Sequence, residues 1–376
     1  MTRTSEHREL PPAQWPAADR RTCDAAIRPN GFLEDAGKGA AWRTASRRSA
    51  QGTYGRWLAW LTSTGVDLEG EAPAARITPD RMQSYVRFQE RLCSSVTVAS
   101  YLGVMCMLVS AMFPAQNWRW LQALQRRLHR KASPSRDKKN RLVPARDLHQ
   151  LGLELMDTAW RLLNEPTAMS EDRRRVVAAA RNYRDGLIIS LLALRPLRVK
   201  NLLEINIGTH LKKEPSGHVL AFNADETKTK RSLRFSYPST LEKALSYYLA
   251  RVRPIRIDAD APGAPARINR PAAAKLWIAQ GGTPMTAGAL KKALARHTLR
   301  RFGRILNAHL FRDCAATTLA NQDPNNVRYA AQLLGHTGLR TTEKSYIALD
   351  SLDSLVRHHD LISAMRRTGR KKRKAG

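Results

Sequence analysis

The residues best suited to chemistry are concentrated in the C-terminal third of the chain. His309 and Arg312 are three residues apart, so on a helix they share one face. A guanidinium binds two phosphate oxygens at once, and an imidazole beside it exchanges a proton near neutral pH. His336 follows in Leu334-Gly335-His336, and Tyr346 stands ten residues further on. Each residue alone is more often structural, but the ordered set favours chemistry on a phosphate by cations and a side-chain nucleophile.

Other kinds of phosphate or metal chemistry lack their motifs. Gly37-Lys38-Gly39 has neither the spacing nor the following Ser or Thr of a GxxxxGK[ST] loop, and no HExxH occurs. Asp258 and Asp260 lie beside Pro262-Gly263, which is typical of a solvated loop, whereas a two-metal nuclease needs several converging carboxylates. The four cysteines are far apart without a CxxC, so they indicate a reducing cytoplasm and no zinc knuckle or disulfide framework. We expect neither a cofactor nor a metal.

The charge of the chain indicates its partner. Among 376 residues, 64 Lys and Arg stand against 32 Asp and Glu, giving a formal net charge of +32. A surplus of this size usually persists because a polyanion neutralises it. The basic residues run along the whole chain, whereas a membrane binder would concentrate them on one amphipathic helix. The longest apolar run, 187–194, falls short of the ~18 residues that a membrane span needs, and no secretory signal is present. We expect a folded protein that binds nucleic acid and no membrane.

The elements that must position these residues begin with a helical region. Residues 1–40 have no sustained period and are interpreted as a flexible N-terminal arm. Stripes at helical spacing, the first of them Tyr54, Trp57, Leu58 and Leu61, predict a compact domain of four or five helices over 41–125. Residues 126–146 are interpreted as a basic linker, because its first sixteen residues hold eight Lys or Arg and no apolar period.

A larger domain is predicted over 147–365, followed by a basic tail at 366–376. It opens with helices. Its segments 219–223 and 231–237 predict two antiparallel strands, the second by its alternation, joined by the turn 225–230. Helices return after the strands. The predicted fold class is therefore mainly α with a small antiparallel β-sheet in the C-terminal domain.

In this order, the motifs resemble those of the tyrosine recombinase (phage integrase) family. His309-Leu310-Phe311-Arg312 matches the HxxR box of that family. Leu334-Gly335-His336 with Thr341-Thr342-Glu343 matches its LGH…TT box, and Tyr346 stands at the position of its nucleophile. The resemblance runs from about residue 148 to 350. The helical region 42–128 resembles the core-binding domain of the family by pattern alone.

Two further matches lie upstream. Pro196-Leu197-Arg198 fits the box of the first active-site Arg, and Arg198 is chosen over Arg195 because Leu202-Leu203 then falls correctly behind it. The turn 227–230 fits the catalytic lysine of the family, with Lys228 preferred over Lys230.

Three positions depart from the family pattern. Asn201 stands where an acid is frequent, three residues after Arg198, and Asp313 replaces a frequent second His. Tyr346 lies ten residues past His336, where nine is commonest, and Ser345 occupies the ninth place. Tyr346 is nevertheless chosen because no other Tyr follows Tyr329.

The resemblance implies a site-specific DNA recombinase or integrase that cleaves and rejoins strands through a 3′-phosphotyrosyl intermediate, without ATP or metal. It implies a helical, SAM-like core-binding domain and an α+β catalytic domain, acting on double-stranded DNA as a homo-oligomer, a tetramer on two paired sites, in the cytoplasm at the bacterial nucleoid. The implied catalytic residues are Arg198, Lys228, His309, Arg312, His336 and Tyr346. The residues predicted to bind nucleic acid are Arg126, Arg127, Arg130, Lys131, Lys138, Lys139, Arg141 and Lys230.

Two alternatives remain open at this point. A type IB topoisomerase would use the same chemistry to relax supercoils without a recognition site. A DNA-binding relative with an inactive site is the second alternative, although a missing Tyr, Arg or His would have pointed there and all are present.

Overall fold

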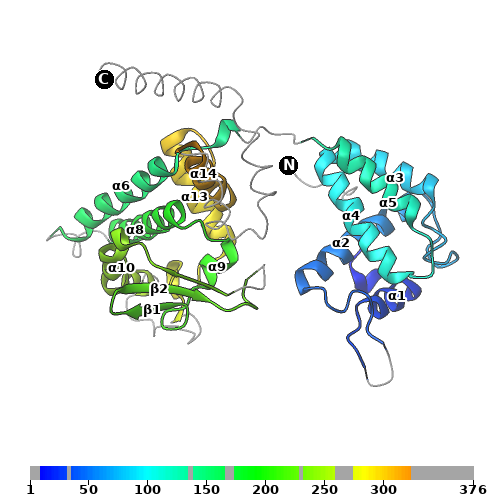
Figure 1. Ribbon diagram of the computed structural model, residues 1–376, viewed down its shortest axis with the longest axis horizontal. Helices are drawn as coiled ribbons and strands as arrows, with labels where there is room; N and C mark the ends of the chain where they lie inside the picture. Colours follow the sequence, from blue (N-terminus) through cyan, green and yellow to red (C-terminus); the bar gives the residue numbers. More distant parts are fainter. Residues whose placement is uncertain are drawn as a thin grey trace, which may run out of the picture. The chain divides into compact units, whose positions relative to one another are not determined.

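The chain forms two compact units, residues 1–137 and 138–376. The computed structural model describes residues 9–31, 35–133, 139–165, 173–227, 232–258 and 274–322. Each unit has its own hydrophobic core, and Figure 1 shows the elements of each.

The described part of the first unit is helical. Its elements are η2 (Pro12–Gln14), α1 (Ala17–Ile27), α2 (Thr44–Ser63), α3 (Pro79–Leu92), α4 (Ser95–Met112) and α5 (Arg119–Lys131). Side-chain caps start two of them, because Thr78 accepts from the Arg81 amide and Ser94 from the Thr97 amide. The helix α4 is packed by α1, α2, α3 and α5, so it is the centre of the unit.

Helix α4 is also the one helix of the described residues that is long and apolar enough to cross a membrane. Its 18 residues have a mean hydropathy of 1.7, and 44% of them are buried inside the unit. Leu102, Met105 and Val109 belong to the core of the first unit. A core helix satisfies the same criterion of length and composition, and α4 is such a helix.

The prediction of a flexible arm over residues 1–40 is wrong for much of that segment. Trp15, Cys23 and Ala26 are buried in the core of the first unit. Asp19 is fully buried, accepting from the Tyr54 hydroxyl at 2.6 Å and from the guanidinium of Arg76 at 2.6 Å. The buried residues of α1 are Asp19, Cys23 and Ala26. An acid and two small side chains make a weak apolar period, and a buried ion pair adds to their packing.

The basic linker is shorter than predicted. Helix α5 continues to Lys131, and the next α-helix begins at Ala145. Leu121, Leu124 and Leu128 pack on the core of the first unit at helical spacing. The Arg and Lys residues among them are good helix formers. The run of cations therefore resembles a linker in the sequence, although in the structure it forms the exposed face of a helix.

The second unit contains the remaining elements. They are η3 (Lys139–Arg141), α6 (Ala145–Leu163), α8 (Arg173–Leu194), α9 (Val199–Glu204), β1 (Leu211–Glu214), β2 (Gly217–Phe222), β3 (Leu233–Ser236), η4 (Ser239–Leu241), α10 (Glu242–Tyr247), a π-helical turn η5 (Tyr248–Val252), α11 (Arg253–Ile257), η7 (Gln280–Gly282), α13 (Ala287–Phe302) and α14 (Ala308–Gln322).

Helices α6 and α8 lie side by side (Figure 1), and α8 is the centre of this unit, since α6, α11, α13 and α14 all pack against it. Two glycines permit the close approach, because a Cβ added to Gly152 would lie 2.6 Å from the Gly186 carbonyl oxygen. Helix α14 packs against both α6 and α8. The segment that follows α8, beginning at Arg195, therefore lies near α14.

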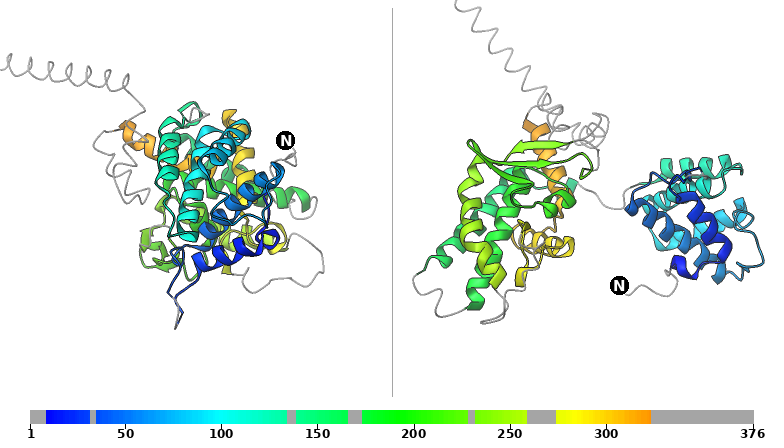
Figure 2. Two further views of the ribbon diagram at one scale, coloured as in Figure 1. Left: turned by 90° about the vertical axis from the view of Figure 1, so that its right-hand side faces the viewer. Right: turned by 90° about the horizontal axis from the view of Figure 1, so that it is seen from below.

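The sheet has three antiparallel strands in the order β1-β2-β3 (Figure 2). Leu220 pairs with Leu211 on one side and with Phe235 on the other. The two predicted strands are confirmed, and the predicted fold class is confirmed with them. Strand β1 was not predicted because its sequence, Leu-Lys-Lys-Glu, has no alternating apolar pattern.

A buried charged cluster joins α8 to α13. Asp185 accepts from Arg184 at 2.7 Å and from Arg296 at 2.7 Å, and the His297 ring lies 3.2 Å from it. Burial alone would raise the pKa of Asp185, but the hydrogen bonds from His297 and Arg184 outweigh burial and hold the pKa below its ordinary value. The carboxylate is therefore charged in the folded unit near neutral pH.

Candidate active site

The segment between α8 and α9 carries the first predicted catalytic arginine. Pro196 follows the end of α8, in agreement with its inability to continue a helix. Arg198 is the N-cap of α9 in an extended conformation, with φ −67° and ψ 144°, and its carbonyl accepts from the Leu202 amide at 2.9 Å. Leu197 and Leu202 are buried in the core. These two anchors fix the backbone of Arg198, whose side chain is half-buried.

Helix α14 carries the second predicted arginine together with His309. The Asn307 side chain accepts from the Leu310 amide at 3.0 Å and so caps the start of the helix. Leu310 and Phe311 are buried, while His309 is exposed and Arg312 is 7% exposed. Leu310 and Phe311 anchor the helix in the core. The HxxR spacing thus places the accessible imidazole of His309 one turn before the buried guanidinium of Arg312.

The structure brings the two arginine-bearing segments together. The Arg312 guanidinium donates a hydrogen bond to the Pro196 carbonyl, across 116 residues of sequence. Because two residues span at most about 7 Å of chain, this contact holds Arg312 beside the backbone from which Arg198 extends. The structure therefore places the backbone that carries Arg198 beside Arg312, and His309 lies one helical turn before Arg312 on α14.

Asn201 lies one turn beyond Arg198 in α9 and is 3% exposed. Among the described residues, its side-chain nitrogen has no hydrogen-bond partner. At this position the resemblance leads one to expect an acidic acceptor, whereas the chain presents a buried amide donor.

Several predicted residues lie outside the described residues. They are Lys138, Lys228, Lys230, His336 and Tyr346. Of the six predicted catalytic residues, the structure places Arg198, His309 and Arg312. The turn that leads to Lys228 is described as far as Thr227, which is fully buried.

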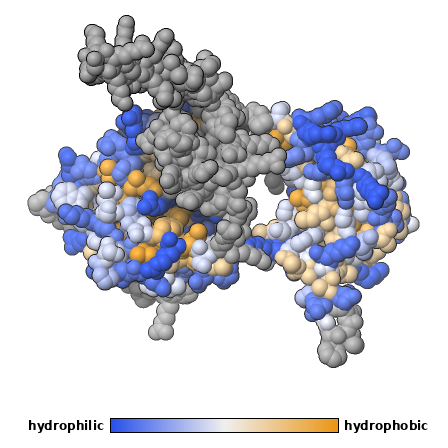
Figure 3. Space-filling view, in the orientation of Figure 1, coloured by the Kyte–Doolittle hydropathy of each residue, from blue (hydrophilic) through white to orange (hydrophobic). Residues whose placement is uncertain are grey.

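The residues predicted to bind nucleic acid divide between the two units. Arg126, Arg127, Arg130 and Lys131 are exposed on α5, and hydrophilic residues predominate on the visible face in that region (Figure 3). In the second unit, the backbone of Lys139 belongs to η3. The guanidinium of Arg141 donates to the Ile305 carbonyl at 2.7 Å, so Arg141 also ties the start of this unit to the segment before α14.

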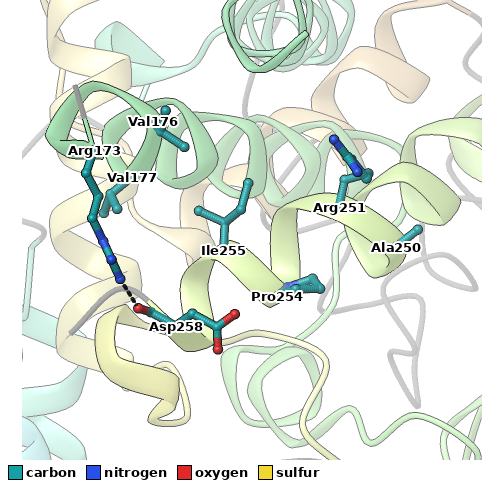
Figure 4. Close-up of a pocket in the computed structure, with 8 residues that line it drawn as sticks. All are labelled: Arg173, Val176, Val177, Ala250, Arg251, Pro254, Ile255 and Asp258. Atoms are coloured by element: carbon teal, nitrogen blue, oxygen red, sulfur yellow. Dashed lines mark hydrogen bonds between the residues drawn. The ribbon is translucent and has the colours of Figure 1, made fainter. Parts of the chain in front are cut away.

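The cavity shown in Figure 4 is not part of this site. It has a volume of about 420 Å³ and is lined by α8 residues Val176 and Val177 and by Pro254 and Ile255 of α11. The Arg173 guanidinium donates across it to the Asp258 carbonyl. At 1.5 Å per residue, α8 separates this cavity from the Pro196 turn by roughly 25 Å. Within the described ranges, no group of three or more His, Cys, Asp or Glu could hold a metal ion.

Comparison with known proteins gives structural likenesses only. No family model matches the chain, and no curated protein matches it. The fold resembles solved site-specific recombinases. A crystal structure of XerA recombinase is 14% identical with a TM-score of 0.39, covering 86% of this chain and 94% of its own. A post-cleavage complex of the XerH site-specific recombinase with a palindromic difH substrate is 14% identical with a TM-score of 0.46, covering 93% of this chain and 95% of its own. At 14% identity these similarities concern the fold and do not establish the function.

Two sets of residues that the structure brings together were missed from the sequence. One is the Asp185 cluster, and the other is His210 with Glu226, which bond at 2.8 Å across 16 residues. Neither set has a spacing typical of a known motif. A signal does exist for Asp185, because a charged pair inside the apolar stretch 183–194 must be buried with partners.

Proposed function

We propose that this chain is a tyrosine recombinase that cleaves and rejoins double-stranded DNA at a specific site through a 3′-phosphotyrosyl intermediate. The observation that carries the proposal is the hydrogen bond from Arg312 to the Pro196 carbonyl. It joins the HxxR helix to the segment of the first arginine, which is the pairing that phosphate chemistry by two arginines requires.

In the proposed reaction, the Tyr346 hydroxyl oxygen attacks the scissile phosphorus and its proton passes to His309. Arg198 and Arg312 bind the nonbridging oxygens, where negative charge grows in the pentavalent transition state. The bond from phosphorus to the 5′-oxygen breaks, and Lys228 protonates that oxygen as it leaves. Covalent catalysis of this kind keeps the phosphodiester energy in the enzyme link, so rejoining is the same steps in reverse.

His336 hydrogen-bonds the phosphate in this scheme. The exposed position of His309 fits its role, because a group that exchanges a proton with the nucleophile must be accessible from outside the core. The buried position of Arg312 fits its role as well, since a guanidinium held by a backbone carbonyl is already oriented before DNA binds.

The remaining parts of the proposal concern binding. The exposed cations of α5 contact phosphates of the DNA backbone, which positions the protein without reading bases. The active form is a homo-oligomer, a tetramer on two paired sites, at the nucleoid in the cytoplasm.

Covalent trapping tests the proposal directly. The full chain is incubated with a library of nicked duplexes of randomised sequence, in excess chelator without nucleotide, and run on a denaturing gel. We expect a DNA-linked band from the wild type, none from Tyr346→Phe, and a normal band from the matched control Tyr329→Phe. A band of equal intensity from Tyr346→Phe, or a strict need for a divalent metal, would refute the tyrosine mechanism.

A further inference from the structure

His210 is held at the exit of α9 by contacts that fix its tautomer. The Asn206 amide donates to its Nδ1 at 3.0 Å, so the proton of the neutral ring resides on Nε2. That Nε2–H donates to Glu226 at 2.8 Å. The ring also stacks on Phe222 at 5.3 Å between centroids, and His210 is 5% exposed. With both nitrogens engaged and one face covered, the imidazole has a single orientation.

Glu226 stands at the other end of this contact, in the turn after β2. Its second carboxylate oxygen accepts from the Asn223 amide at 2.6 Å. The hydrogen bonds from His210 and from the Asn223 amide lower the pKa of Glu226, and the charge of Lys200 lowers it further. Lys200 is two residues beyond Arg198, so Glu226 lies within electrostatic range of the element that begins with the first arginine. The next residue, Thr227, is fully buried.

The contact therefore joins two segments that the proposed function places in one active site. On one side is the loop that follows α9, and on the other is the turn that leads into Lys228. His210 immediately precedes β1, and its carbonyl accepts from the Ala221 amide of β2 at 2.9 Å. Its side chain adds a link from this ladder to Glu226, in the turn beyond β2. A general acid must come within about 2.6–3.2 Å of the atom that it protonates. A lysine whose backbone is fixed spends a larger fraction of its time within that distance.

We propose that His210 and Glu226 are positioning residues for the general acid, holding the turn that carries Lys228 at a set distance from the segment of Arg198. This inference rests on the proposed function. The inference extends the proposed function by assigning a role to two residues that lie outside the family motifs. Lys228 itself lies outside the described residues, and the argument uses its covalent attachment to Thr227.

The chemistry of the leaving group separates this role from a merely structural one. When the bond from phosphorus to the 5′-oxygen breaks, the alkoxide must take a proton, because its conjugate acid is about as weak as water. If sulfur replaces that bridging oxygen, the leaving group is a thiolate with a pKa of about 8.5, and it departs without a proton. A defect in the general acid is therefore suppressed on the sulfur substrate, while a defect in phosphate binding or folding is not.

The test compares Glu226→Gln with Asp225→Asn in the full chain. Both remove one acid from the same turn and so change the electrostatic attraction to DNA equally. Only Glu226→Gln places an amide against the Asn223 N–H and weakens the link to His210, because Asp225 is exposed on the neighbouring position. Single-turnover cleavage is measured on a nicked duplex of trapped sequence, with oxygen and then with sulfur at the bridging 5′ position.

General acid catalysis typically contributes 10²–10⁴ in rate, so we expect Glu226→Gln to cleave the oxygen substrate about 10- to 100-fold more slowly than wild type. On the sulfur substrate it should come within about threefold of wild type, and Asp225→Asn should match wild type on both. Arg312→Ala should be slow on both substrates. His210→Asn, which keeps an acceptor for the Asn206 amide and loses the bond to Glu226, should reproduce the behaviour of Glu226→Gln.

Two results would overturn the inference. Glu226→Gln and His210→Asn could cleave the oxygen substrate as fast as Asp225→Asn, or they could be equally slow on oxygen and sulfur while melting at the wild-type temperature. A wild type that cleaves neither substrate would instead overturn the proposed function. The melting temperature of each variant separates a positioning defect from a folding defect.

Discussion

Replacement of Asp19 by Asn should destabilise the first unit severely. Asp19 is fully buried, Arg76 is 1% exposed, and their ion pair has a length of 2.6 Å. Two other nitrogens of that guanidinium, Nε and Nη1, have no hydrogen-bond partner among the described residues. Asp19 is therefore the main compensation for a buried positive charge, and Asn keeps its volume while removing its charge.

Removing one partner of a buried ion pair costs about 3–5 kcal/mol. Domains have a total free energy of unfolding of about 5–15 kcal/mol, so this loss is a large fraction of it. Each kcal/mol shifts the melting temperature by roughly 2–8 °C over domain sizes of 60–250 residues. We expect Asp19→Asn to lower the melting temperature of the first unit by at least about 6 °C.

Tryptophan fluorescence of the full chain during heating measures this effect. Six of the eight tryptophans lie within residues 1–137, so the signal reports mainly the first unit. The matched control is Asp24→Asn, which removes an exposed acid from the same helix. Replacing both charges, Asp19→Leu with Arg76→Met, should recover most of the loss, because an apolar pair often substitutes for a buried ion pair. If Asp19→Asn and Asp24→Asn melt within about 2 °C of each other, the ion pair does not hold α1 in place.

Three further predictions follow from the other contacts. Because the pKa of Asp185 is lowered in the folded state, its charge stabilises the second unit above the unfolded pKa of about 3.9, and this contribution is lost as the pH falls through the folded value. Acid unfolding followed by circular dichroism should show that Asp185→Asn is destabilised at pH 7 and has a flatter pH dependence below pH 4; an unchanged curve contradicts this. Replacing the four cations 126, 127, 130 and 131 by Ser should lower the slope of log K against log salt by up to about 3.6, at 0.9 per phosphate, in binding titrations on a random duplex. No change in slope would remove α5 from the DNA interface. Gly152→Ala should lower the free energy of unfolding by about 1–3 kcal/mol through overpacking, measured by denaturant titration, and a neutral result would show that α6 and α8 separate easily.

The parts of the fold that follow a hydrophobic period could be predicted from sequence. The stretch 183–194 is nearly all apolar apart from the pair Arg184-Asp185 and forms a fully packed part of α8, and the alternation of Leu233 and Phe235 marks β3. Helix α1 could not be predicted this way, because its decisive contact joins Asp19 to Tyr54 and Arg76. Polar side chains carry no period, so a helix fixed by an ion pair resembles a flexible segment.

The candidate site was predictable to the extent that its residues share a helix turn. His309 and Arg312 are joined by a spacing of three, so the period of the helix alone places them on one face. The bond from Arg312 to Pro196 spans 116 residues and uses a backbone acceptor, which has no residue-type signature. His210 and Glu226 were missed for a related reason, since a buried His and an acid in a turn are each common in structural roles.

The central place of α4 has a consequence for synthesis of the chain. Proteins leave the ribosome N-terminus first, so α1, α2 and α3 emerge before α4, and α5 follows it. Until residue 131 has been made, the apolar surface of α4 that α5 covers stays open to water, chaperones and other nascent chains. Fragments of this protein that end before Lys131, or that begin after α1, will leave that helix partly uncovered. Expression boundaries for the first unit should therefore enclose residues 9 to 133.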